Sequence, residues 1–129
     1  MLETKSVTEL MNVFEVSFKD ILVILKAISN EKRFIILIAL LSGEKTFNDL
    51  KIETKLKKTA LSNHLLKLIN AKLILKPDHN KYCLTSDGEL FIRALEAAYD
   101  QSDKKEKKDT EELQKRQFSD TFIESFFGH

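Results

Sequence analysis

Apolar residues recur every three or four positions through the first thirty residues, which is the spacing of one face of an α-helix. This spacing predicts helices over residues 7–15 and 18–28, either separate or fused into one. Ser6 with Glu9 forms a capping-box pattern before the first helix, and Ser17 with Asp20 forms a similar pattern before the second. The recurring apolar residues are Leu10, Phe14, Phe18, Ile21, Leu25 and Ile28.

The next helix, predicted over residues 31–41, is apolar around most of its circumference and therefore belongs to the core. A short helix over residues 46–54 follows it, and a longer helix is predicted over residues 57–70. The longer helix has one apolar stripe, which indicates a single buried side. That stripe consists of Leu61, Leu65 and Leu68.

Two short extended runs, residues 73–76 and 81–84, enclose a Pro-Asp-His-Asn sequence. Proline, aspartate and asparagine favour turns, so these runs predict a β-hairpin. A further helix is predicted from residue 85 or 86 to about residue 99. Residues 101–110 contain no apolar side chain, and they either extend that helix into solvent or form a disordered linker.

Aromatic residues return at the end of the chain, where Phe118, Phe122 and Phe126 are spaced as one helical stripe, with Phe127 directly after it. Three roles fit such a stripe. It packs onto the core of this chain, lengthens a dimer interface, or docks onto a partner protein.

Composition narrows the class of protein. The chain has one cysteine and so no internal disulfide, which favours a reducing compartment. The longest apolar run, residues 34–41, is shorter than the ~20 residues that span a bilayer, so we expect no membrane association and a cytoplasmic protein. The pattern places no Ser, His and Asp together and no carboxylate pair in an apolar pocket, so we expect no enzyme and no cofactor.

The charge is distributed unevenly, although the formal net charge is only +1. Residues 51–82 carry eight lysines and two acidic residues, whereas the segments on both sides carry an excess of acid. A basic block between acidic flanks is typical of a surface that binds a polyanion. A solvated lysine-rich surface fits the charges equally well.

Two helices joined by a tight turn, with a basic hairpin after the second, describe a mainly α winged helix-turn-helix fold. A helix fits the major groove of B-DNA, and a hairpin can flank it along the backbone. The short polar residues away from the leucine stripe are Thr59, Ser62 and Asn63. The lysines at the start and the margin of the same helix are Lys57, Lys58 and Lys67. We expect the polar residues to reach base edges and the lysines to neutralise phosphates.

Residues 56–74, LKKTALSNHLLKLINAKLI, resemble the helix-turn-helix core of ArsR-type winged-helix repressors. The resemblance rests on the Ser62-Asn63-His64-Leu65 sequence and covers about residues 25–99. It implies that the residues of the predicted recognition helix that contact DNA are Lys58, Thr59, Ser62 and Asn63. It also implies that Lys76 and Lys81 of the wing reach the flanking backbone or minor groove. Lys72 stands where glycine is common in this family, which implies a left-handed lysine.

The resemblance further implies a homodimer built from the first and last helices. Its candidate interface residues are Leu10, Met11, Phe14 and Phe18 at one end, and Phe91, Leu95, Ala98 and Tyr99 at the other. Many members of the family sense metals through thiols on the helix before the recognition helix, or through Asp and His on the last core helix. Residues 46–54 contain neither Cys nor His, and residues 85–99 contain no His, so we expect no metal sensing.

The predicted organisation has three parts: a helical extension for dimerisation over residues 1–24, a winged-helix DNA-binding domain over residues 25–100, and a charged linker with a Phe-rich C-terminal tail over residues 101–129. The predicted function is sequence-specific binding of double-stranded DNA by a homodimeric transcriptional regulator. The basic block lacks arginine, the commonest partner of guanine, whereas Asn63 suits adenine, so we expect an A·T-rich target. The alternative is a winged-helix module that binds partner proteins in a larger assembly.

Overall fold

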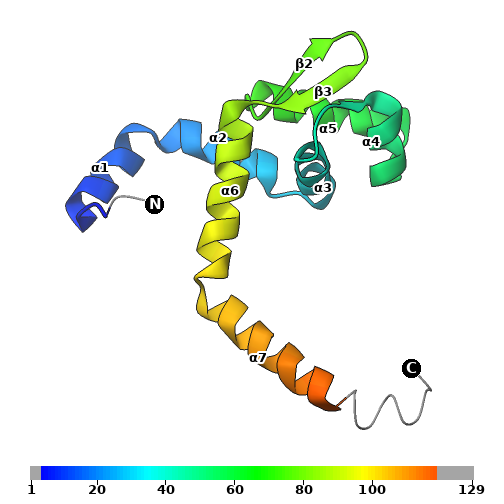
Figure 1. The fold of residues 1–129 in the computed structure, drawn as a ribbon. Coiled ribbons are helices and arrows are strands. Elements are labelled where there is room, and N and C mark those ends of the chain that lie inside the picture. Colours follow the sequence, from blue (N-terminus) through cyan, green and yellow to red (C-terminus); the bar gives the residue numbers. More distant parts are fainter. Residues whose placement is uncertain (1–3, 119–129) are drawn as a thin grey trace. The chain divides into compact units, whose positions relative to one another are not determined.

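The computed structural model describes residues 4–118, and the chain divides into two compact units, Met1–Leu90 and Phe91–His129. Figure 1 shows the order of the elements along the chain. These elements are α1 (Val7–Val16), α2 (Phe18–Ile28), α3 (Glu31–Leu40), β1 (Lys45–Thr46), α4 (Phe47–Thr54), α5 (Lys58–Asn70), β2 (Ile74–Asp78), β3 (Lys81–Leu84), α6 (Ser86–Asp100) and α7 (Asp103–Phe118). The described chain is thus mainly helical with one small sheet, as the sequence predicts.

The two N-terminal helices are separate, because Ser17 leaves the helical conformation between them, at φ −107° and ψ 17°. The Ser6 hydroxyl accepts the backbone N–H of Glu9 at 3.2 Å and so caps α1 as predicted. The second predicted capping box is wrong, since within residues 4–118 the Ser17 side chain makes no capping hydrogen bond. Ser17 instead closes α1, donating its backbone N–H to the carbonyl of Val13.

The core lies between α3, α4, α5 and the start of the wing. Ile36 and Leu37 of α3 and Leu50 of α4 are fully buried, which confirms α3 as a central core helix. Burial of each such side chain stabilises the fold by roughly 1.5–3 kcal/mol. The other fully buried apolar residues come from α5 and the segment after it: Leu61, Leu65, Leu68, Leu73 and Ile74.

The wing has one strand more than the predicted hairpin. Strands β2 and β3 pair antiparallel, and β1 adds to the free edge of β3, giving the order β1-β3-β2. In β1, Lys45 lies opposite Tyr82 and Thr46 lies opposite Lys81. A two-residue strand is too short to carry an alternating pattern, so the sequence did not predict it.

Helix α5 ends in a Schellman motif. Lys72 takes the left-handed conformation at φ 61°, as expected where glycine is common. The backbone N–H of Leu73 donates to the carbonyl of Leu68 at 3.0 Å, and that of Lys72 donates to Ile69 at 2.9 Å. These bonds satisfy the last carbonyls of α5 and turn the chain directly into β2.

Thr85 joins the end of α5 to the start of α6. Its hydroxyl donates to the carbonyl of Lys72 at 2.7 Å and accepts the backbone N–H of Gly88 at 2.9 Å. Gly88 is buried, and a Cβ at this position would collide with the backbone carbonyl of Leu73. The start of α6 is therefore fixed by the same residues that end α5.

The polar segment after α6 forms a helix of its own. Helix α6 ends at Asp100, and the Ser102 hydroxyl accepts the backbone N–H of Lys105 at 3.3 Å to cap α7. Residues 101–110 are therefore neither a continuation of α6 nor a disordered linker. Phe122, Phe126 and Phe127 lie outside the described residues, and the role of the Phe stripe stays a prediction. Between residues 4 and 118, no helix is long and apolar enough to cross a membrane.

Candidate nucleic-acid interface

The turn between α4 and α5 begins from a fully capped helix. Thr46 and Asp49 form a capping box at the start of α4, with both hydrogen bonds at 3.0 Å. The hydrogen bond that the Thr46 backbone N–H donates to the Asp49 carboxylate lowers the pKa of that carboxyl, and the Thr46 side chain lowers it further. At the other end, Lys55 closes α4 in the left-handed conformation at φ 59°. The chain can therefore reverse within three residues and start α5 at Lys58.

Buried hydrogen bonds hold this turn in place. Thr54 is fully buried, and its hydroxyl donates to the carbonyl of Leu50 at 2.7 Å and accepts the backbone N–H of Leu56 at 3.3 Å. The Lys32 ammonium of α3 donates to the carbonyl of Thr54 at 2.8 Å. Sequence reasoning missed both Thr54 and Lys32, because neither belongs to an apolar stripe.

Helix α5 has one buried and one exposed side. The predicted leucine stripe is buried throughout, which fixes the rotation of the helix about its axis. Leu66 on the opposite side is 55% exposed. The predicted base-reading residues Thr59, Ser62 and Asn63 and the predicted phosphate contact Lys67 are all exposed.

The N-terminus of α5 is electrically positive. Lys57 and Lys58 are both exposed there, and the first turn contains no acidic residue. In the described part of the chain, the Lys57 side chain makes no capping hydrogen bond. The first backbone N–H groups therefore lack a side-chain acceptor, and together with the two lysines they favour a phosphate group.

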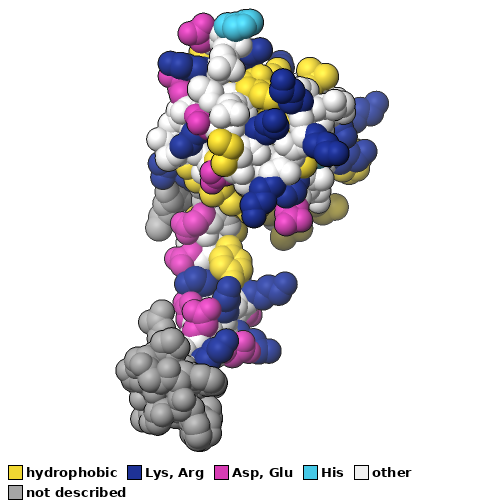
Figure 2. Space-filling view, turned by 90° about the vertical axis from the view of Figure 1, so that its right-hand side faces the viewer, with side chains coloured by type: hydrophobic (Ala, Val, Ile, Leu, Met, Phe, Trp, Pro, Cys, Tyr) yellow, Lys and Arg dark blue, Asp and Glu magenta, His cyan; other side chains and the backbone are white. Residues whose placement is uncertain are grey.

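The wing presents its two predicted lysines at the surface. Lys76 and Lys81 are exposed, and the Lys76 ammonium lies 5.5 Å from the ring centroid of Tyr82, in cation–π contact. Figure 2 shows Lys and Arg side chains gathered on the face of the first unit that carries α4. The wing and the exposed side of α5 thus both present lysines to solvent, and α5 adds short polar groups.

His64 lies on α5 but contacts the core side rather than the exposed side. The buried Arg33 side chain places Nη1 3.0 Å from His64 Nδ1. Since arginine only donates, Nδ1 accepts this hydrogen bond and the imidazole is neutral. Burial, with Arg33 and Lys67 nearby, lowers the pKa of His64. His64 therefore packs towards the core and bonds Arg33 rather than lying on the exposed side of α5.

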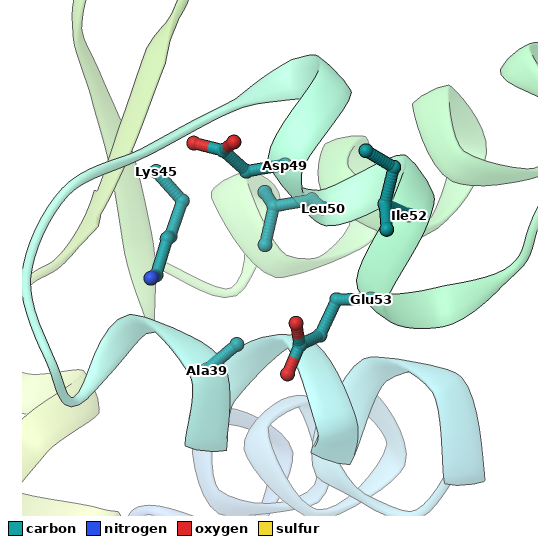
Figure 3. Close-up of a pocket in the computed structure, with 6 residues that line it drawn as sticks. All are labelled: Ala39, Lys45, Asp49, Leu50, Ile52 and Glu53. Carbon is teal, nitrogen blue, oxygen red and sulfur yellow. The ribbon is translucent and has the colours of Figure 1, made fainter.

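A hollow of about 220 Å³ lies between α3, β1 and α4. Figure 3 shows the Lys45 and Glu53 side chains on opposite sides of it, both directed towards α3, with Ala39 below them. Asp49 at the same hollow is occupied in capping α4. Among residues 4–118, no three His, Cys, Asp or Glu side chains come together in a way that could hold a metal ion.

The predicted dimer residues lie in both units of the chain. In the first unit, the apolar side chains of α1 are exposed, with Met11 at 65% and Phe14 at 52%, and Phe18 at the start of α2 is exposed as well. In the second unit, Leu95, Ala98 and Tyr99 are exposed and Phe91 is half-buried. A hollow lined by apolar side chains between α1 and α2 includes Phe14 and Phe18.

Comparison with known proteins agrees with a winged helix-turn-helix. The family model described as "Bacterial regulatory protein, arsR family" matches residues 30–76, which run from the N-cap of α3 into β2. HlyU from Vibrio cholerae N16961 is 30% identical over 66% of this chain and 97% of its own, with a TM-score of 0.58. The chain therefore belongs to the ArsR family of DNA-binding bacterial regulators. No curated protein matches it in sequence.

Other solved structures share the fold. The transcriptional regulator HlyU from Vibrio vulnificus CMCP6 is 28% identical over 69% of this chain and 97% of its own, with a TM-score of 0.58. Mb0332 from Mycobacterium bovis, described as a homodimeric winged helix-turn-helix DNA-binding domain, is 19% identical over 77% of this chain and 92% of its own, with a TM-score of 0.59. These relatives are regulators of transcription or DNA-binding domains by description.

Proposed function

We propose that this chain is a homodimeric transcriptional regulator that binds specific sequences of double-stranded DNA, with α5 in the major groove and the wing on the flanking backbone or minor groove. One observation carries the proposal. The leucine side of α5 is buried in the core, and its opposite side is exposed, polar and flanked by lysines. A rigidly held helix with such a side is what major-groove recognition requires.

Two groups of residues have different roles in this proposal. Thr59, Ser62 and Asn63 face the bases, and the lysines at positions 57, 58, 67, 76 and 81 neutralise phosphates. Asn63 pairs well with adenine, and the basic block has no arginine for guanine, which supports an A·T-rich target. Most of the affinity then comes from lysine–phosphate contacts, and the preference for sequence comes from the short polar residues.

The homodimer is supported by the exposed apolar faces of α1 and α6. A second copy would cover these faces and place two α5 helices about 34 Å apart, at successive major grooves. The chain acts by binding and not by catalysis, and no metal ion takes part in its regulation. The segment Thr46–Thr54, where related metal sensors carry thiols, has no Cys or His to serve as a ligand.

The salt dependence of DNA binding tests the proposal. A regulator with six to ten phosphate contacts loses ~10³–10⁵ in affinity between 50 and 200 mM salt. The measurement is the electrophoretic shift of genomic fragments from near the coding region of this protein. The alternative is a module that docks onto partner proteins, which the exposed Leu66 favours. Such a module would retain DNA weakly at every salt concentration, and this result would contradict the proposal.

A pair of variants on α5 tests the roles of its residues. Asn63→Ala removes the base reader, so the preference between sequences falls by ~1–3 kcal/mol. Lys67→Ala removes a phosphate contact, so the affinity falls alike for all sequences and the salt slope decreases by about one. If binding-site selection returns G·C-rich sites, or if both variants act identically, the assignment of roles is wrong.

A further inference from the structure

A groove lies between α2 and α5, and apart from Lys67 none of the residues that line it is a proposed DNA contact. It encloses about 330 Å³, which is within the range of roughly 300–1,000 Å³ that is typical of small-molecule sites. Its apolar lining comes from Val23 and Ala27 of α2 and from Ala71, which follows α5 as its C-cap. Its polar lining comes from Lys26, Arg33, Lys67 and Asn70.

The groove carries three positive charges. In the described part of the chain, no acidic residue lines it, and neither Lys26 nor Lys67 takes part in an ion pair. Lys26 stands on α2 and Lys67 on α5, so the two cations approach from opposite helices. Cations that line one hollow without counter-charges favour an anion between them. Burial lowers the pKa of His64, and the positive charges of Arg33 and Lys67 nearby lower it further.

Arg33 is held rigidly beside these lysines. Its Nε donates to the carbonyl of Ala27 at 2.6 Å, and its Nη2 donates to the carbonyl of Lys26 at 3.0 Å. With the bond to His64, three of its five N–H groups are bonded within residues 4–118, and the other two are on the terminal nitrogens. A buried guanidinium fixed in this way loses little further freedom when it binds an anion.

We propose that this groove binds a small organic anion, with a carboxylate or phosphate head group between Lys26, Arg33 and Lys67. The small side chains of Val23, Ala27 and Ala71 form the surface against which the apolar body of the ligand packs. Asn70 supplies an amide at the edge of the groove, which can donate to the ligand or accept from it.

The binding of an anion in the groove does not depend on the function proposed above. Its effect on DNA binding rests on that function. Lys67 is also a proposed phosphate contact, so an anion that draws its ammonium into the groove withdraws it from DNA. The bound anion also adds negative charge beside α5. Occupation of the groove therefore weakens DNA binding, as expected of an effector site.

Titration of the full chain with benzoate and with phenyl phosphate, followed by amide NMR at constant ionic strength, tests the groove directly. Both probes carry an anionic head on an apolar ring. We expect saturable shifts of the amides of residues 23–27 and 67–71, and none of this pattern from neutral benzyl alcohol. Lys26→Gln removes one cation without touching a proposed DNA contact, and it weakens probe binding roughly three- to tenfold. Lys19→Gln, an exposed lysine on the same helix, leaves probe binding unchanged.

The proposal is overturned by no shifts from either probe, by equal shifts from benzyl alcohol, or by equal losses in Lys26→Gln and Lys19→Gln. Inorganic phosphate that binds as tightly as phenyl phosphate would also overturn it, since the apolar surface would then have no part. A second arm measures DNA affinity with and without the tighter probe. If the protein binds no DNA at all, the proposed function is wrong. The NMR titration still shows whether the groove binds an organic anion.

Discussion

Helices α1 and α5 are both amphipathic, yet the chain buries the apolar side of only one of them. Leu61, Leu65 and Leu68 of α5 lie against the core, whereas α1 has no buried residue and leaves Met11 and Phe14 largely exposed. The difference lies in the connections. Helix α5 follows a three-residue turn and ends directly in the wing, so α3, α4 and β2 surround it. Among the described residues, α1 is connected to the rest through Ser17 and packs mainly on α2.

The comparison of α1 with α5 shows that an apolar stripe on a helix can have two different roles. An apolar stripe that its own chain covers supplies stability, and it orients the opposite side for binding. An apolar stripe that stays exposed in the described chain offers a surface for a second molecule. This is why the exposed face of α1 supports the proposed homodimer, while the buried face of α5 supports the proposed interface with DNA.

The largest expected effect comes from deleting a side chain on the buried side of α5. Leu61→Ala removes a fully buried side chain and leaves a cavity, so the free energy of unfolding falls by about 2–5 kcal/mol. Urea denaturation followed by circular dichroism measures it. Leu66→Ala makes the same substitution on the exposed side of the same helix and costs less than about 1 kcal/mol. Equal losses in the two variants would mean that the rotation of α5 about its axis is wrong.

The next effect concerns α1. Phe14→Glu places a charge in the face that a second copy would cover, so the dimer is weakened by on the order of 2 kcal/mol, which is about thirtyfold in its dissociation constant. Sedimentation equilibrium measures the dissociation constant, and circular dichroism checks that the fold is kept. Asn12→Glu adds the same charge to an exposed polar position of α1 and serves as the control. If Phe14→Glu leaves the dimer intact, α1 does not belong to the dimer interface.

The same comparison explains what the sequence could predict. The spacing of leucines in α5 and of apolar residues in α1 identified both helices, because each repeat runs over several turns. The roles of Lys32 and Arg33 could not be predicted, because their side-chain hydrogen bonds join residues 6 to 31 positions apart. The groove between α2 and α5 was missed for this reason. Its lysines come from separate parts of the sequence, and only the fold brings them to one hollow.

A smaller effect is expected where α5 ends. Lys72 holds a left-handed conformation that glycine adopts without strain, so Lys72→Gly raises the free energy of unfolding by roughly 0.5–1 kcal/mol. Lys51→Gly, inside α4, lowers it by about 1 kcal/mol because the glycine there loses more conformational freedom. Thermal denaturation of the two variants gives shifts of opposite sign. A loss of stability in Lys72→Gly would mean that the lysine side chain itself contributes at this turn.

The smallest effect is the pH dependence of stability that comes from the contact between His64 of α5 and Arg33. Because the pKa of His64 is lowered from its ordinary value of 6.5, the folded chain binds this proton less tightly than the unfolded chain does. The contribution to stability is therefore fully present above that ordinary value, and it decreases as the pH falls from there towards the lowered pKa. His64→Asn keeps an acceptor for Arg33 and has no proton to gain, so its stability should change less between about pH 7.5 and about pH 5.5. Urea midpoints at the two pH values measure this difference. Parallel pH profiles for the two proteins would show that protonation of His64 does not oppose its contact with Arg33. This contact is the only polar link between α3 and the middle of α5 in residues 4–118, and it would then be insensitive to acid.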